Sequence, residues 1–277
     1  MAIGDIGRSV RDALVGIVRG AGDVVSATVE ETRRATVAAL GGIADVGKAA
    51  SGLVADVVTG ALEAAAQVGG EAGAVAKGAV IGVIKGVGEG TTVTVGVVSD
   101  AVRAAVKGTG QVGGDVAETA ATLAHSVVSA TKETALGVES AAVGVAHGAI
   151  MGAKDIGGDL GETAKGAIRG SVRGAQEVGA DAVEAVRATA SGLVKATGEV
   201  GGDVTEVTRQ TVVGAIQAAK AAGLDAEDAA SAAATGAMEG AKEVGEAAVN
   251  AVSGVASGTI EGVKVVVKAP FKKKDTN

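Results

Sequence analysis

A unit of 22 residues repeats through almost the whole chain. Residues 156–177 (IGGDLGETAKGAIRGSVRGAQE) are its clearest copy, and the units that start at Val178 and Val200 begin VGADAVEAV and VGGDVTEVT without an insertion. The same step in both directions divides the chain into twelve blocks over residues 2–265 and a basic tail over residues 266–277. Because a fixed period of this length is typical of repeat architectures, it constrains the fold more than any other feature.

One position of the unit is aliphatic in every block. We expect this column to form the apolar face of the repeat, turned toward lipid or toward a partner helix. Its members are Val18, Leu40, Leu62, Ile84, Val106, Val128, Ile150, Val172, Val194, Ile216, Met238 and Ile260.

A second position is Gly or Ala in every block, and in six blocks it completes a Gly-x-x-x-Gly pattern. Small residues four apart on a helix let two backbones approach closely. We therefore predict close helix–helix packing at Gly16, Gly20, Gly82, Gly86, Gly148, Gly152, Gly170, Gly174, Gly236, Gly240, Gly258 and Gly262.

The period itself indicates helix. Twenty-two is twice eleven, and eleven residues complete three turns at about 3.67 residues per turn, close to the α-helical value. On a helical wheel with this pitch the aliphatic and Ala-rich columns share one continuous arc, and the acidic columns lie opposite. The sequence thus predicts an all-α protein of Gly/Ala/Val-rich amphipathic helices.

Two arrangements of these helices fit the sequence. In the first, blocks join into long helical segments that kink at the Gly pairs, because the apolar arc stays in phase there and two residues leave little room for a reversal. In the second, each block is a separate helix, since Gly113-Gly114-Asp115 and Glu118, with copies at 157–162 and 201–206, resemble a helix end followed by an Asp N-cap and a Glu at N3. We favour the first, with the long helices folded back as a bundle or assembled side by side.

The composition argues against a conventional enzyme. The chain has 46 Gly, one Phe and no Trp, Tyr or Cys, so its core is built from small residues and holds no disulfide. Each Gly inside a helix costs about 0.8–1.0 kcal/mol relative to Ala. We expect such helices to form when lipid or another helix covers their apolar face.

No pattern in the sequence points to a chemical site. Gly108-x-Gly110-x-x-Gly113 matches a dinucleotide-binding pattern but follows no strand, and the repeat register explains why His125 and His147 lie 22 residues apart. The Asp/Glu pairs fit helix capping and pairing with Lys and Arg. We expect no catalytic, cofactor-binding or metal site and no small-molecule substrate, and we expect no nucleic-acid partner because the charges form no basic stripe.

The termini and hydropathy predict a cytoplasmic or peripheral membrane protein. The N-terminus lacks the apolar stretch of a secretory signal, and the longest charge-free runs, 140–153 and 247–260, are shorter than the roughly 20 residues of a membrane span. The tail is interpreted either as a solvated segment or as a contact for anionic lipid headgroups. The headgroup contacts would be Lys268, Lys272, Lys273 and Lys274.

Three segments of the sequence resemble the repeats of proteins with 11-residue amphipathic helices. These are GETAKGA at 161–167, SATKETA at 129–135 and GTIEGVK at 258–264, and the proteins are synucleins, perilipins, exchangeable apolipoproteins and late-embryogenesis-abundant proteins. The resemblance implies reversible binding to lipid surfaces, or protection of membranes and proteins during drying.

These observations lead to one functional hypothesis and two alternatives. The first hypothesis is a non-enzymatic coat or scaffold that lies along a lipid surface, where many weakly binding repeats add up to stable attachment. The alternatives are self-assembly of the helices into a homo-oligomeric bundle, filament or scaffold, and stress protection of the late-embryogenesis-abundant kind.

Overall fold

The protein is an all-α repeat, as the sequence predicts. The computed structural model describes residues 3–18, 23–41, 46–255 and 258–267. The elements within these ranges are α1 (Ile3–Val18), α2 (Val24–Leu40), α3 (Val46–Val68), α4 (Ala72–Gly90), α5 (Val95–Gln111), α6 (Val116–Ser129), the 3-10 turn η1 (Ala130–Glu133), α7 (Val138–Asp155), α8 (Leu160–Val178), α9 (Ala182–Glu199), α10 (Val204–Ala222), α11 (Ala226–Val244), α12 (Glu246–Val255), β1 (Gly258–Ile260) and β2 (Val263–Val265).

The helices are separate and short, which corrects the preference for long segments kinked at the Gly pairs. Helices α7 to α11 begin at residues 138, 160, 182, 204 and 226, a step of 22 residues. Each block in this region is therefore one helix followed by a reversal, which is the second arrangement that the sequence allowed.

Glycine in the left-handed region makes the short reversals possible. Gly179 has φ +69° and ends α8, and the next N–H, that of Ala180, donates back to the Ala175 carbonyl at 2.9 Å. Gly201 (φ +63°) ends α9 in the same way. This C-terminal motif satisfies the last carbonyls of the helix and turns the chain sharply, so three or four residues are enough for each reversal between α7 and α11.

An Asp N-cap starts the next helix directly after the turn. Asp159 Oδ1 accepts a hydrogen bond from the Glu162 N–H at 3.0 Å, and Asp203 Oδ1 does the same for Glu206 at 3.0 Å. Asp115 caps α6 through the Glu118 N–H. The Gly and Asp columns of the repeat thus set where one helix ends and the next begins.

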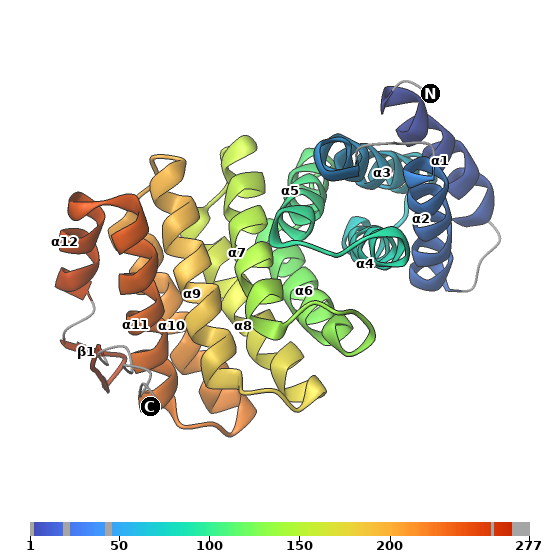
Figure 1. The fold of residues 1–277 in the computed structure, drawn as a ribbon. Helices are drawn as coiled ribbons and strands as arrows, with labels where there is room; N and C mark the ends of the chain where they lie inside the picture. The colour runs from blue at the N-terminus through green and yellow to red at the C-terminus, as the bar shows by residue number, and fades with distance from the viewer. Residues whose placement is uncertain (1–2, 19–22, 42–45, 256–257, 268–277) are drawn as a thin grey trace, which may run out of the picture.

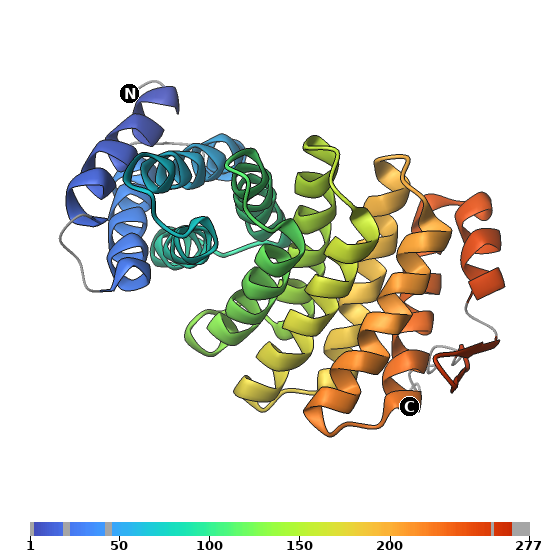
Figure 2. The ribbon, with the colours of Figure 1, turned by 180° about the vertical axis from the view of Figure 1, so that it is seen from behind.

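The helices form two stacked layers. Each helix from α1 to α11 packs most extensively on a helix two places away in the chain, as in the pairs α6 and α8, α2 and α4, α9 and α11, and α5 and α7. Odd-numbered helices therefore make one row and even-numbered helices the other, and α1 and α12 lie at opposite ends of the array (Figure 1). The view from behind shows the same progression along the chain (Figure 2).

Close backbone approach between these paired helices depends on glycine. On α4, a Cβ at Gly82 would lie 2.5 Å from the Val29 carbonyl oxygen of α2 and would also overlap Thr32 Oγ1. The facing α2 side chains Thr28, Thr32 and Thr36 are fully buried. Their hydroxyls donate to carbonyls four residues earlier in α2, at 2.7 Å. The interface is therefore narrow, and its buried hydroxyls are satisfied within α2.

The last block departs from the helical repeat that we expected to continue to residue 265. Helix α12 ends at Val255, and β1 and β2 pair antiparallel with Gly258 opposite Val265. Glu261 (φ 48°) and Gly262 (φ 77°) form the two-residue turn. Positive φ at both turn positions matches the twist of a hairpin, and the flanking Thr, Ile and Val residues are β-branched and favour strands.

None of the helices in the described ranges has the length and apolar character that a membrane span requires.

Two glycines of α4 provide a matched test of the stacking. We expect Gly82→Ala to destabilise the protein by about 1–3 kcal/mol, because the added methyl group has no room at the α2 interface. Gly88→Ala should instead raise stability by up to about 1 kcal/mol, since its nearest neighbour, Val93 Cγ2, would lie at an ordinary 3.5 Å. Urea denaturation monitored by circular dichroism measures both. If both substitutions change the free energy of unfolding equally, the close packing of Gly82 against α2 is contradicted.

Candidate functional site

The structure places most of the aliphatic column between helices of the same chain. Nine members are buried: Leu40, Leu62, Ile84, Val106, Val128, Ile150, Val172, Val194 and Ile216. Met238 and Ile260 are half-buried, and the side chain of Val18 lies outside the described residues. In this folded state the column faces other helices rather than solvent.

The glycines of the Gly-x-x-x-Gly patterns fall into three groups. A Cβ would crowd a neighbouring helix at Gly82, Gly86, Gly148, Gly152, Gly170, Gly174, Gly236 and Gly240. Gly16 faces open space, and Gly258 and Gly262 lie in the terminal hairpin. Gly20 lies outside the described residues, as do Lys268, Lys272, Lys273 and Lys274 of the tail.

The structure also places the glycine motif of residues 108–113 and the two histidines. Gly108, Gly110 and Gly113 lie at the end of α5 and in the turn that follows it, so the dinucleotide-like pattern follows a helix. His125 Nε2 lies 2.5 Å from Glu177 Oε2, and His147 Nε2 lies 2.8 Å from Glu199 Oε2. Among the described residues, no three His, Cys, Asp or Glu side chains gather in a way that could hold a metal ion.

Those two histidine contacts belong to a series that we call the carboxylate ladder. The ladder consists of acids at steps of 22 or 44 residues, Glu133, Asp155, Glu177, Glu199 and Glu243. Each contacts a basic residue or histidine on the helix two places earlier: Lys85 with Glu133 at 2.6 Å, Arg103 with Asp155 at 2.8 Å, His125 with Glu177, His147 with Glu199, and Lys195 with Glu243.

The contacts of the ladder favour the charged form of Asp155 and Glu177. Hydrogen bonds from the Arg103 guanidinium, at 2.8 and 2.9 Å, lower the pKa of Asp155. The hydrogen bond from the Ser129 hydroxyl, followed by that from His125, lowers the pKa of Glu177. Asp155 and Glu177 therefore join their helices to the helix two places earlier as ionised carboxylates.

One position of the ladder lacks an acid. Between Glu199 and Glu243 the same 22-residue step falls on Ala221, at the interface of α8 and α10. Two residues of α8 occupy the positions from which the other acids are contacted. Arg169 stands in the column of His125 and His147, and Arg173 stands in the column of Lys85 and Lys195. Two cations thus remain at an interface from which the expected carboxylate is missing.

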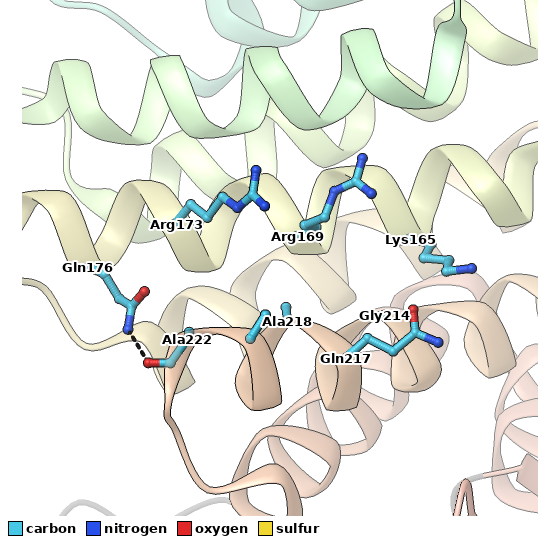
Figure 3. Close-up of a pocket in the computed structure, with 9 residues that line it drawn as sticks. Lys165, Arg169, Arg173, Gln176, Gly214, Gln217, Ala218 and Ala222 are labelled. Atoms are coloured by element: carbon cyan, nitrogen blue, oxygen red, sulfur yellow. Dashed lines mark hydrogen bonds between the residues drawn. The ribbon is translucent and has the colours of Figure 1, made fainter.

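The structure has a cavity of about 440 Å³ at this interface (Figure 3). Its α8 wall carries Lys165, Arg169, Arg173 and Gln176, and its α10 wall carries Gly214, Gln217, Ala218, Ala221 and Ala222. The Gln176 amide reaches across and donates to the Ala222 carbonyl at 3.1 Å. We call this cavity the α8–α10 groove, and none of its lining residues is acidic.

The cations of the groove are only partly neutralised. Lys165 Nζ lies 3.6 Å from Glu162, and Arg169 Nη2 lies 2.6 Å from Glu118 of α6. Arg169 Nε is buried without a hydrogen-bond partner. Arg173 is exposed and forms no ion pair within the described residues. The arrangement presents cationic N–H donors, whose charge and geometry suit an anion.

Sequence reasoning missed this site although the repeat contained the information. One column of the repeat, which we interpreted as part of the polar face, contains Arg103, His125, His147 and Arg169. Their partner acids stand in a second column, 52 residues further along the chain. Comparing the two columns would have identified Ala221 as a position without an acid 52 residues after Arg169, but only the structure shows that the columns meet.

Comparisons with known proteins give no family. No model of a protein family matches the chain, and no curated protein does. A crystal structure of a de novo designed helical repeat protein is similar over 71% of this chain and 97% of its own, with 21% sequence identity and a TM-score of 0.29.

The ladder predicts a pH-dependent loss of stability in one variant. We expect Asp155→Asn to lower the free energy of unfolding at neutral pH by up to about 1 kcal/mol, as for a partly exposed ion pair. Because the folded-state pKa of Asp155 lies below its ordinary value of 3.8, the deficit relative to wild type should disappear as the pH falls through both values.

Urea denaturation of both proteins at neutral and acidic pH measures this difference. Glu71→Gln is the control, because Glu71 is exposed and its side chain makes no capping hydrogen bond. A deficit for Asp155→Asn that stays constant with pH would contradict the assignment.

Proposed function

We propose that this chain is a non-enzymatic helical-repeat scaffold that associates with a second copy of itself through the exposed face of α1 and α2. The observation that supports this is the open surface at Gly16. A Cβ there would meet no atom of the described chain within 4 Å, whereas the equivalent Gly148 is packed against the Ser99 carbonyl of a helix two places earlier.

The exposed face combines small and apolar residues with the charged residues Glu31 and Arg34. No described residue lies within 4 Å of a Cβ at Gly16, on the side that receives an earlier helix elsewhere in the array. A cavity of about 400 Å³ lies there, lined by Ile6, Ser9, Val10, Glu31, Arg34, Ala35, Ala38 and Ala39. Small and apolar residues at this face allow the close helix approach seen inside the protein.

At the opposite end of the array, a face of α11 is already covered. Strand β2 packs on α11, and the Val266 N–H donates to the Ser231 hydroxyl at 3.4 Å. Head-to-tail growth would require the hairpin to leave α11. Pairing of two α1–α2 faces needs no such change and gives a closed dimer with twofold symmetry.

A lipid coat would require a different conformation. Burial of the aliphatic column between helices means that the helices would have to separate before that column could enter a membrane surface. Helices that separate to bind lipid stay helical but lose the ion pairs between them. Adding vesicles therefore distinguishes a lipid coat from a self-associating scaffold.

The proposal predicts concentration-dependent association that one substitution removes. The wild type should shift from monomer to dimer as its concentration rises in analytical ultracentrifugation. Gly16→Glu should weaken dimerisation at least about tenfold by placing a charge in a closely packed interface. Gly254→Glu, near the end of α12 and also facing open space, is the matched control and should dimerise normally.

Two results would contradict self-association. One is a wild type that stays monomeric at the highest soluble concentration, and the other is Gly16→Glu associating as strongly as the control. The stability difference between the wild type and Asp155→Asn reports the Arg103–Asp155 ion pair. If anionic vesicles abolish this difference, binding to a lipid surface is favoured instead.

A further inference from the structure

We propose that the α8–α10 groove binds a small molecule carrying carboxylate or phosphate groups, which occupies the place of the carboxylate missing at Ala221. This inference does not depend on self-association, because the groove lies between α8 and α10 and the proposed dimer face lies on α1 and α2.

The ladder defines what the missing group would do. At the neighbouring interface of α7 and α9, Glu199 accepts a contact from His147 at 2.8 Å. At the interface of α6 and α8, Glu177 accepts hydrogen bonds from both His125 and the Ser129 hydroxyl, at 2.5 and 2.9 Å. A carboxylate at position 221 would stand in the same register relative to Arg169 and Arg173. Alanine leaves that space to a ligand.

The groups that remain suit an oxyanion. Guanidinium groups present paired N–H donors that match the geometry of carboxylate and phosphate. Arg173 is exposed and has no ion-pair partner in the described part of the chain, and Arg169 keeps a buried Nε without an acceptor. Figure 3 shows both arginine side chains leaving α8 on the side away from α10, where Arg169 pairs with Glu118. Arg173 and Ala221 both line the groove, so a ligand held there lies next to the Arg173 side chain.

The size of the groove indicates a molecule larger than a single inorganic ion. A volume of about 440 Å³ falls within the range of about 300–1,000 Å³ that is usual for small-molecule sites. Gln176 and Gln217 also line it, with amide N–H groups that donate to the Ala222 carbonyl and to Glu261, and Ala218 and Ala222 add apolar surface. A ligand with two or more anionic groups and a short carbon or phosphate backbone fits this lining.

The electrostatic surroundings make the site specific to this interface. The whole chain carries a formal charge of −7, so attraction of an anion requires a local excess of positive charge. The groove has Lys165, Arg169 and Arg173 at steps of four residues along α8, and Glu118 and Glu162 neutralise only two of them. In the α9–α11 interface, by contrast, Lys195 is neutralised by Glu243.

Isothermal titration calorimetry with two probes tests the proposal. Citrate represents the carboxylates and pyrophosphate the phosphates, and both are titrated at constant ionic strength with chloride as the screening ion. We expect saturable binding of at least one probe to one site per chain, and the stronger of the two identifies the preferred class of anion. Absence of saturable binding by both probes would overturn the proposal.

Restoring the missing acid is the decisive variant. Ala221→Glu should weaken binding of the preferred probe at least about tenfold, because an internal carboxylate then competes for the same arginines. Arg173→Gln should weaken it by a similar factor. Thr205→Glu adds the same charge to the exposed surface of α10, about 24 Å away along the helix, and should bind as the wild type does.

The variants also separate a binding defect from a folding defect. Ala221→Glu should unfold at an equal or higher temperature than the wild type, since it completes the ladder, and the probe should no longer raise that temperature. If Ala221→Glu and Thr205→Glu weaken binding equally, the effect is general charge repulsion and the assignment to the groove is wrong.

Discussion

The structure depends on the close approach of helix backbones two places apart in the chain. Gly82 on α4 and Gly170 on α8 each lie against a carbonyl of the earlier helix, so near that a methyl group has no room. Such contacts replace the large side chains that this composition lacks, because a core of Ala and Val gains its dispersion energy from short distances. The same contacts set the spacing at which the ladder of ion pairs can form.

Much of the fold was predictable from the 22-residue step. The period identified an all-α repeat, and Gly113-Gly114-Asp115 contained both the helix stop and the next N-cap. We nevertheless favoured continuous helices, because an apolar arc that stays in phase gives no information about chain reversal. The left-handed φ of Gly179 and Gly201 resolves this. The terminal hairpin was not predictable from the repeat, since local β-propensity at Thr259 and Ile260 overrides the helical register there.

The candidate site was predictable only in part. The column containing His125, His147 and Arg169 is evident in the sequence, and so is the absence of an acid at Ala221. What the sequence does not show is that residues 48 or 52 positions apart face each other, because this follows from stacking every second helix. A substitution within a repeat can be interpreted once the contact made by the equivalent residues is known. Here Ala221 replaces the acid of an ion pair, and the interface contains a cationic groove.

The distance between residues 88 positions apart tests the two-layer stack most directly. The chain has no Cys, so Lys154→Cys and Lys242→Cys can be spin-labelled together on exposed sites of α7 and α11. Two helix spacings in one layer predict a backbone separation of about 20 Å in a pulsed electron resonance experiment. A continuous helix would place the same positions about 130 Å apart. A dominant distance beyond about 50 Å would contradict the stack, which allows only two helix spacings of about 10 Å each.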